Sequence, residues 1–223
     1  MLRSASTGWI FFDLGSTLWD ESEAASKRLA DLAAHVEGGP HEVSVAELEA
    51  LIEKHHLCHS PNPVRAALRE AIADETLLRD ALRQTRYAHE LIRPYPDAEP
   101  VLAALHGVYR LGIIANQPPG IPARLQALGW DRWFDVVLGS GDVGLEKPSA
   151  AIFERALEAA DTRASDSIYV GDRIDNDIVP AKALGFGTIR YLGGFARVQT
   201  PRGPAETADV TVSTLSDILT HLL

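Results

Sequence analysis

Residues 9–18 read WIFFDLGSTL, a short apolar run that ends in Asp13 and a turn of small polar residues. A second run of this kind, IYVGD, spans residues 168–172 and ends in Asp172. Short apolar runs bounded by turn residues predict strands buried on both faces of a parallel sheet. Because open α/β sheets bind ligands outside the carboxyl ends of their strands, we expect Asp13 and Asp172 to meet at one crevice. Two acids there can hold Mg²⁺, and one of them can attack phosphorus.

The composition narrows the classes of protein to which the chain can belong. Its 223 residues fit one core domain that carries an insertion. The formal charge of −10, from 21 Lys and Arg against 31 Asp and Glu, would repel a polyanion, and no run of basic residues offsets it. We therefore expect no nucleic-acid partner.

Cysteine content and hydropathy indicate a cellular compartment. Cys58 is the only cysteine in the sequence, which rules out an internal disulfide and favours a reducing compartment. The sequence has no signal-peptide apolar region and no apolar stretch near the roughly 20 residues that span a bilayer. We expect a cytoplasmic protein with no membrane partner, and the sequence does not indicate an oligomeric state.

The first part of the chain has a helical pattern. Between residues 20 and 91, apolar residues recur at three and four spacing, as in Leu29, Leu32 and Val36, and no strand pattern interrupts them. Breaks at residues 38–40 and 60–63, rich in Gly and Pro, divide this region into about four helices. We assign residues 19–93 to an inserted, all-helical domain.

Beyond residue 94, short apolar or β-branched runs alternate with helical segments. The runs are residues 111–115, 136–138, 168–170, 188–191 and 209–212. Residues 193–206, rich in Gly and Pro, are expected to form a loop before the last strand. The alternation predicts an α/β fold, with a Rossmann-like parallel sheet flanked by helices and joined by right-handed crossovers. Residues 1–18 and 94–223 form this core.

Acidic residues at two strand ends are the candidate metal ligands. Burying Asp13 behind an apolar run is costly unless the acid meets a cation, although a helix-capping role would also suit this residue alone. Residues 171–178, GDRIDNDI, hold three acids in a short span, which suits Mg²⁺. We expect Asp172 to ligate directly and Asp177 to act through water or to orient a neighbour. Asp175 or Asn176 is equally suited to cap the next helix.

Lys147 is the candidate cationic side chain of the site. It lies in GLEKP, residues 144–148, where Pro148 can begin a helix and leaves the lysine in the preceding loop. Its ammonium group can neutralise a phosphoryl oxygen and offset charge between the aspartates. The turn at residues 15–17 lets backbone amides approach an anion, and Thr17 adds a hydroxyl.

Together these motifs resemble the haloacid dehalogenase superfamily. The positions that match in order and spacing are Asp13 to Thr17, Ala115-Asn116, Lys147-Pro148, and Gly171-Asp172 to Asp177. The resemblance covers essentially the whole chain, and residues 19–93 are similar to the cap domain that such proteins insert after the first core strand. It implies a Mg²⁺-dependent hydrolase, specifically a phosphatase that acts on a small phosphorylated metabolite.

The resemblance also implies a role for each residue of the site. Asp13 would attack the phosphoryl group and form an aspartyl-phosphate that water then hydrolyses. Thr17 and Lys147 would hold the phosphoryl oxygens, and the amide of Asn116 would contribute to substrate binding. The implied Mg²⁺ ligands are Asp13, the backbone carbonyl of Gly15, Asp172 and Asp177. The cap would close over the site and select the leaving group.

Two positions depart from the superfamily pattern. Gly15 replaces the second aspartate that protonates the leaving group in most phosphatases of this kind, a loss of roughly 10²–10⁴-fold on a poor leaving group. Ala115 replaces a serine or threonine that hydrogen-bonds the phosphoryl group, a loss of roughly 1.5–3 kcal/mol. We therefore expect an activated substrate, such as an acyl, aryl or anomeric sugar phosphate, or a proton supplied by a cap residue.

Other functions stay open at this point. The two departures keep a catalytically weak module that binds a phosphorylated ligand or a protein partner as the main alternative. A dehalogenase that attacks carbon is a lesser one, because dehalogenases lack the Gly-Asp pair that Gly171 and Asp172 supply here. A phosphonate-cleaving enzyme would use a cap lysine as a Schiff-base amine, for which Lys54 is a candidate and otherwise a solvated helix residue.

A cluster of histidines in the helical insertion also needs an interpretation. His55 and His59 are four residues apart and share a helix face, but no third metal ligand is apparent beside His56 and Cys58. A polar helix end is the simpler interpretation, and replacement of the missing acid by one of the histidines is the alternative. Trp19, where the insertion begins, is a candidate for substrate contact.

Overall fold

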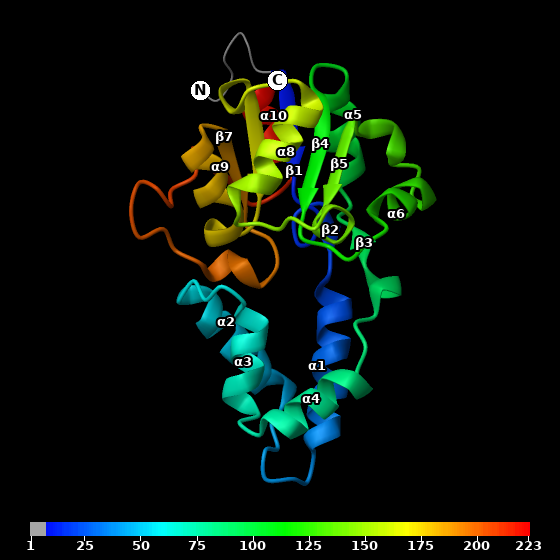
Figure 1. Ribbon diagram of the computed structural model, residues 1–223, viewed down its shortest axis with the longest axis vertical. Helices are drawn as coiled ribbons and strands as arrows, with labels where there is room; N and C mark the ends of the chain where they lie inside the picture. Colours follow the sequence, from blue (N-terminus) through cyan, green and yellow to red (C-terminus); the bar gives the residue numbers. More distant parts are fainter. Residues whose placement is uncertain (1–7) are drawn as a thin grey trace. The chain divides into compact units, whose positions relative to one another are not determined.

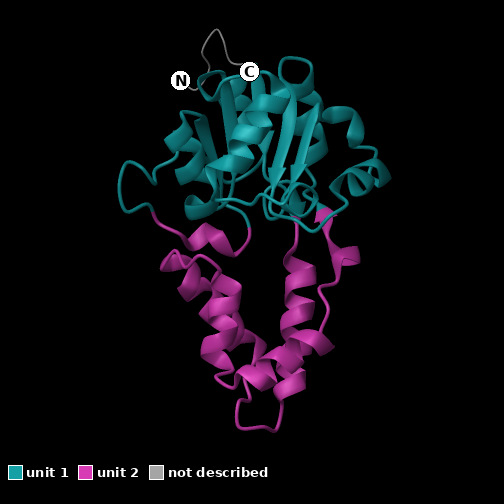
Figure 2. Cartoon of the chain, viewed as in Figure 1, with its two compact units in different colours: residues 1–19, 94–193, 201–223 teal, residues 20–93, 194–200 magenta. Residues whose placement is uncertain are grey.

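The computed structural model describes residues 8–223, which form two compact units (Figure 2). One unit contains residues 8–19 together with Pro94–Gly193 and Pro201–Leu223. The other contains Asp20–Arg93 and Gly194–Thr200. Among residues 8–223, no helix is both long enough and apolar enough to cross a membrane.

The first unit is built on a six-stranded parallel sheet with the strand order β5-β4-β1-β6-β7-β8. Its strands are β1 (Trp9–Phe12), β4 (Arg110–Ala115), β5 (Val136–Gly139), β6 (Ser167–Gly171), β7 (Gly187–Tyr191) and β8 (Val210–Val212). Strand β1 lies between β4 and β6, with Phe11 opposite Gly112 on one side and Tyr169 on the other. The α/β fold predicted from the alternation of strands and helices is confirmed.

Helices cover both faces of this sheet (Figure 1). Helices α8 and α9 pack on one face, and α5 and α10 lie on the opposite face. The helices of this unit are α5 (Ala98–His106), α6 (Ile121–Ala127), α7 (Ser140–Val143), α8 (Ala150–Ala160), α9 (Val179–Leu184) and α10 (Asp217–Leu222). Every residue of β1 and β6 is buried, as expected for the central strands of a parallel sheet. These strands therefore hold the residues that follow them in fixed positions.

The second unit contains helices that pack around their own apolar core. They are α1 (Ser22–Val36), α2 (Val45–Leu57), α3 (Pro63–Ala71) and α4 (Glu75–Gln84), and the shared core includes Leu32, Leu48, Ile52 and Leu68. Ser44 and Glu47 form a capping box that fixes the start of α2. The short strands β2 (Trp19–Asp20) and β3 (Arg93–Pro94) pair where the chain enters and leaves this region.

Residues 194–200 differ from the loop expected between the last two strands. The segment contains a 3₁₀ turn at Phe195–Val198 and belongs to the second unit. Phe195 packs against the apolar core of that unit, and Arg197 forms an ion pair with Glu53 at 2.6 Å. His59 Nε2 donates to the carbonyl oxygen of Thr200 at 3.2 Å. The assignment of residues 19–93 as a functional cap stays a prediction.

Candidate active site

Asp13 stands at the carboxyl end of the central strand β1. Its backbone N–H donates to the carbonyl oxygen of Val170 at 2.9 Å, which continues the pairing of β1 with β6 by one residue. The following loop folds back on Leu14, whose carbonyl oxygen accepts hydrogen bonds from the backbone N–H groups of Thr17, Leu18 and Trp19. The Thr17 hydroxyl then lies 3.4 Å from Asp13 Oδ2. The sheet and this loop together hold the Asp13 carboxylate in place.

Asp172 and Asp177 reach the same place from the end of β6. Asp172 directly follows that strand, and Asp177 lies in the single π-helical turn Ile174–Ile178. Asp177 Oδ2 accepts a hydrogen bond from the Arg173 backbone at 2.9 Å, which turns the carboxylate back toward the sheet. A β-carbon on Gly171 would lie 2.6 Å from the β-carbon of Asp177, so only glycine permits this approach. The glycine of the Gly-Asp pair therefore has a steric reason.

Lys147 lies between these carboxylates, and its side chain is 1% exposed. Its Nζ donates to Asp13 Oδ1 at 2.7 Å, to Asp177 Oδ1 at 2.6 Å and to the Tyr169 hydroxyl at 2.9 Å. An ammonium group has three hydrogens, so each one has an acceptor.

The side chain of Asn116 clamps the backbone of Lys147. Asn116 Nδ2 donates to the Lys147 carbonyl oxygen at 2.8 Å, and Asn116 Oδ1 accepts from the Lys147 N–H at 2.8 Å. Asn116 directly follows strand β4, so the clamp joins the Lys147 loop to the end of the sheet. Direct contact of this amide with substrate stays a prediction.

The electrostatics of the cluster follow from burial. Burial raises the pKa of Asp13 to about 6, against the lowering effect of the Lys147 ammonium. Burial, and then the charges of Asp177 and Asp13, raise the pKa of Asp172 well above its usual value. Burial alone would lower the pKa of Lys147, but the charges of Asp13 and Asp177 outweigh it and raise that pKa. Asp13 and Asp177 both pair with the Lys147 ammonium group, and with Asp172 the carboxylates of this cluster outnumber its ammonium groups.

This donor set fits a hard divalent cation. Carboxylate oxygens of Asp13, Asp172 and Asp177 all lie within 4.8 Å of one another, and all three residues are buried. Magnesium is bound in proteins through a few carboxylates and keeps several waters, which matches such a set. Among residues 8–223, no other group of His, Cys, Asp or Glu side chains meets the same distance criterion. The structure therefore contains a buried acidic group that can bind a metal.

The structure brings most of the residues selected from the sequence to one place. Asp13, Thr17, Lys147, Asp172 and Asp177 form the cluster, and Gly15 lies in the loop after Asp13. Their roles in binding and chemistry stay predictions.

Asp175 takes no part in the group of candidate metal ligands. Its carboxylate forms an ion pair with the guanidinium of Arg173. Neither Asp175 nor Asn176 caps the following helix, because the N-cap residue of α9 is Ile178.

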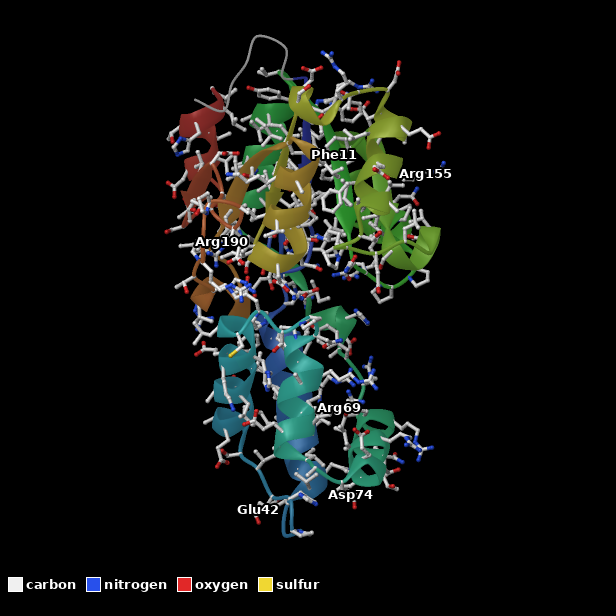
Figure 3. The ribbon with its side chains drawn as sticks, turned by 60° about the vertical axis from the view of Figure 1, so that its left-hand side comes forward. Phe11, Glu42, Arg69, Asp74, Arg155 and Arg190 are labelled. Atoms are coloured by element: carbon white, nitrogen blue, oxygen red, sulfur yellow. The ribbon has the colours of Figure 1, made fainter. Side chains whose placement is uncertain are left out.

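Sequence reasoning did not identify two buried polar side chains of this region. Tyr169 on β6 contacts Lys147, and Arg190 on β7, labelled in Figure 3, donates from Nε to the Asp172 carbonyl oxygen at 3.2 Å. Burial lowers the pKa of the Arg190 guanidinium, although Asp172 opposes this effect. The available signal was a phenol and a guanidinium in the short strands SIYVG and GTIRY, which are buried along almost their whole length.

Lys54 and His55, two of the polar residues considered for a function in the second unit, bond to neighbouring side chains of that unit. Lys54 and His55 both contact Glu70, and His55 Nδ1 lies 3.0 Å from the Ser60 hydroxyl. His55 and His59 belong to no group of candidate metal ligands. In the first unit, Trp19 is buried and its ring lies 4.2 Å from the guanidinium carbon of Arg124.

Comparison with known proteins identifies the family. A model of the family "haloacid dehalogenase-like hydrolase" matches residues 8–185. The chain is similar to glyceraldehyde 3-phosphate phosphatase of Methanothermobacter thermautotrophicus, with 30% identity over 94% of this chain and 98% of the relative. The enzyme of the same name from Methanopyrus kandleri is 28% identical over 94% of each chain.

A solved structure supports the fold. The crystal structure of a haloacid dehalogenase-superfamily hydrolase from Geobacter sulfurreducens aligns with a TM-score of 0.69 and 20% identity, over 98% of this chain and 97% of that one. At this identity the likeness concerns the fold alone. The family match spans far more than half of the residues, and it agrees with the ordered motifs of the sequence. The chain therefore belongs to the haloacid dehalogenase-like hydrolase family and is a hydrolase of that fold.

Proposed function

We propose that the chain is a Mg²⁺-dependent phosphatase that hydrolyses a small phosphorylated metabolite through an aspartyl-phosphate on Asp13. The observation that carries this proposal is the cluster of Asp13, Asp172 and Asp177 around the ammonium of Lys147. A nucleophilic carboxylate, further acids for a metal and a cation for the phosphoryl group are the parts that phosphoryl transfer to an aspartate requires.

The chemistry divides between two half-reactions. In the first, an Asp13 carboxylate oxygen bonds to phosphorus while the bond from phosphorus to the leaving oxygen breaks. The leaving group departs as an anion, which takes a proton from solvent. In the second, a water oxygen bonds to phosphorus while the bond from phosphorus to the Asp13 oxygen breaks. Inorganic phosphate leaves, a proton of the water passes to solvent, and the Asp13 carboxylate is restored. Lys147 and Thr17 hold the phosphoryl oxygens, because their donors already lie against the Asp13 carboxylate.

The metal would be held by carboxylates of Asp13 and Asp172 and by the Gly15 carbonyl, with Asp177 as a ligand through water. When bound, Mg²⁺ would offset the charge between the carboxylate nucleophile and the phosphoryl group. The excess of carboxylates over ammonium groups in this cluster supports that assignment.

The finer substrate class rests on Gly15. A glycine cannot protonate a leaving group, so we propose a preference for leaving groups that depart without a positioned acid, such as aryl, acyl or anomeric sugar phosphates. The relatives named glyceraldehyde 3-phosphate phosphatase support a small phosphorylated metabolite. Their named substrate is an ester of a primary alcohol, which is a poor leaving group. Gly15 thus favours a good leaving group, whereas the relatives suggest a poor one. A panel that contains both kinds of phosphate distinguishes the two substrate classes.

A second candidate is a binding module that holds a phosphorylated ligand without turnover. The residues that favour it are Gly15 and Ala115, which lack the side-chain groups that most phosphatases of this superfamily use. Asp13, Lys147 and Asp172, which the proposed phosphoryl transfer requires, are all present in one cluster, and this favours the enzyme.

The test is release of phosphate from aryl, acyl, anomeric sugar and alkyl phosphates, with and without Mg²⁺, by the native chain and by Asp13→Asn. We expect turnover that needs Mg²⁺, favours good leaving groups and disappears in Asp13→Asn. No turnover of any class, combined with phosphate binding that Asp13→Asn retains, would replace the enzyme with the binding module. Equal turnover of alkyl and aryl phosphates would contradict the substrate preference alone.

A further inference from the structure

Tyr169 places a phenol hydroxyl against the ammonium group of Lys147 in the interior of the protein. The residue lies on β6 and is fully buried. Its hydroxyl accepts from Lys147 Nζ at 2.9 Å. It lies 2.9 Å from the carbonyl oxygen of Ile114 and 3.2 Å from Asp177 Oδ1, to either of which it can donate. Ile114 belongs to β4, on the far side of β1 in the sheet order, so the tyrosine side chain extends across the central strand. One side chain thus joins β6, β4 and the lysine.

The position of that hydroxyl is rigid. The Tyr169 ring packs edge-on against Phe153 and Phe186 within the apolar core of the sheet, with ring centroids 5.1 Å and 6.4 Å from its own. The one hydroxyl hydrogen serves the Ile114 carbonyl and Asp177 Oδ1, which only accept, and an ammonium group only donates. Toward Lys147 the phenol oxygen can therefore act only as an acceptor. Lys147 therefore meets a fixed, neutral acceptor.

The three hydrogens of the ammonium group have different fates in the proposed reaction. One points to Tyr169, one to Asp177 and one to Asp13. The Asp13 carboxylate must be free to bond to phosphorus, so the hydrogen on Asp13 is the one that can turn to a phosphoryl oxygen. Because the ammonium group is tetrahedral, fixing the first two hydrogens sets the direction of the third.

We propose that Tyr169 is a positioning residue that directs the Lys147 ammonium at the phosphoryl group. This inference rests on the proposed phosphatase function and extends it to a residue outside the four motifs. Ala115 follows Ile114 and has no hydroxyl to offer a phosphoryl oxygen. Phosphate recognition in this chain then depends more heavily on the direction of Lys147, and through it on Tyr169.

Tyr169→Phe removes the acceptor and leaves the ring in place. The chain offers a matched control, because the buried Tyr109 hydroxyl also donates to a backbone carbonyl, that of Leu222, at 2.8 Å. Tyr109→Phe removes a comparable buried hydrogen bond at a residue that touches none of the site residues. The measurements are kcat and KM on an aryl phosphate, binding of Mg²⁺ alone, and binding of inorganic phosphate in the presence of Mg²⁺ by calorimetry.

We expect Tyr169→Phe to lower kcat by roughly tenfold, the effect of one lost hydrogen bond to a charged group, and to weaken phosphate binding. Mg²⁺ binding should stay within about twofold, and the denaturation midpoint should fall no further than in Tyr109→Phe. A merely structural role would lower both midpoints equally and leave kcat and phosphate binding unchanged, which would overturn the inference. A native chain that neither hydrolyses nor binds phosphate would overturn the phosphatase proposal itself, and this inference with it.

A spectroscopic measurement is independent of turnover. The sequence has four lysines, so the ¹⁵N spectrum of the ammonium groups is simple, and Lys147→Arg assigns the signal of Lys147. We expect this signal to be protected from exchange in the native protein and in Tyr109→Phe, and to be lost or broadened in Tyr169→Phe. Equal protection in all three proteins would contradict a fixed direction of the ammonium group.

Discussion

Lys147 in the first unit and Lys54 in the second make nearly the same contact in different surroundings. Lys147 Nζ lies 2.7 Å from Asp13 Oδ1, and Lys54 Nζ lies 2.5 Å from Glu70 Oε1. The Lys147 side chain is 1% exposed, whereas that of Lys54 is 55% exposed. Water screens an exposed pair, but a buried charge that loses its partner keeps the full cost of desolvation. Burial, more than contact distance, therefore distinguishes Lys147 from Lys54.

The charge balance around the two lysines also differs. Near Lys147, the carboxylates of Asp13, Asp172 and Asp177 outnumber the ammonium group. Near Lys54, the single carboxylate of Glu70 is shared with His55. An excess of buried carboxylate calls for a cation, and a shared surface carboxylate does not. The pattern of charge therefore supports the proposal of a metal and phosphate site in the first unit.

The largest expected effect comes from removing each lysine in turn. Lys147→Met leaves Asp13 and Asp177 buried without their partner, and we expect the free energy of unfolding in Mg²⁺-free buffer to fall by about 3–5 kcal/mol. Lys54→Met should leave it unchanged within error. Urea denaturation of the native chain and of both variants measures the two changes in the free energy of unfolding. Equal losses for the two lysines would show that burial does not govern the difference.

A second prediction restores the acid that Gly15 replaces. Gly15→Asp should raise kcat/KM on an alkyl phosphate by roughly 10²-fold, because a poor leaving group gains a proton donor. Gly15→Asn has nearly the same shape and no titratable group, so it should give no such gain. Steady-state kinetics on one alkyl and one aryl phosphate decide the matter. A gain that appears equally in Gly15→Asn would point to loop geometry in place of acid catalysis.

A third prediction compares two asparagines that bond to the backbone. Asn116→Ala removes the clamp on Lys147 and should lower both kcat and the free energy of unfolding, the latter by about 1 kcal/mol. Asn62 caps helix α3 through the Arg65 N–H, so Asn62→Ala should cost a similar stability of about 1 kcal/mol and leave kcat unchanged. Denaturation and kinetics are measured together. An equal fall of kcat in Asn62→Ala would show that lost stability, and not loss of the clamp on Lys147, lowers kcat.

The smallest effect concerns a carboxylate of the first unit that lies outside the site. Burial alone would raise the pKa of Asp209, but hydrogen bonds from Thr188 and Lys182 outweigh it and hold the pKa below its usual value. Such a group contributes stability above its unfolded pKa of about 3.9, and that contribution is lost as the pH falls through the lower folded value.

Asp209→Asn should therefore be slightly less stable than the native chain near pH 6. The difference should shrink as the pH is lowered below about 4. Urea midpoints across this range measure it. A gap that grows toward acid pH would mean that the pKa of Asp209 is raised in the folded state.

The strands and the acidic residues that follow them could be predicted from the sequence. An apolar run that ends in aspartate has few other interpretations in a parallel sheet, and Asp13 and Asp172 stand where that rule put them. Lys147 was found from its loop position before a proline, which does not depend on distant contacts. Each of these signals lies within a few neighbouring residues, so the sequence alone is enough to detect it.

Other features depend on contacts between distant residues. Tyr169 has the pattern of a core residue, and only the folded sheet shows that its hydroxyl reaches Ile114 and Lys147. The bonds of the Asn116 amide to the backbone of Lys147, 31 residues further along the chain, are a contact of the same kind, while its contact with substrate stays a prediction. Residues 194–200 looked like a loop because Phe195 and Arg197 find their partners in α2 and its neighbours, far back in the sequence.

The central claim is that Asp13 becomes phosphorylated during turnover. The direct measurement is rapid acid quench of the enzyme with Mg²⁺ and an aryl phosphate, followed by peptide mass spectrometry. The account predicts a transient phosphoryl group on the peptide that contains Asp13, which is absent in Asp13→Asn and in an active-site-intact control without substrate. Two results would contradict phosphorylation of Asp13. One is turnover by the native chain with no phosphoryl group on Asp13 at any time, and the other is turnover that Asp13→Asn retains.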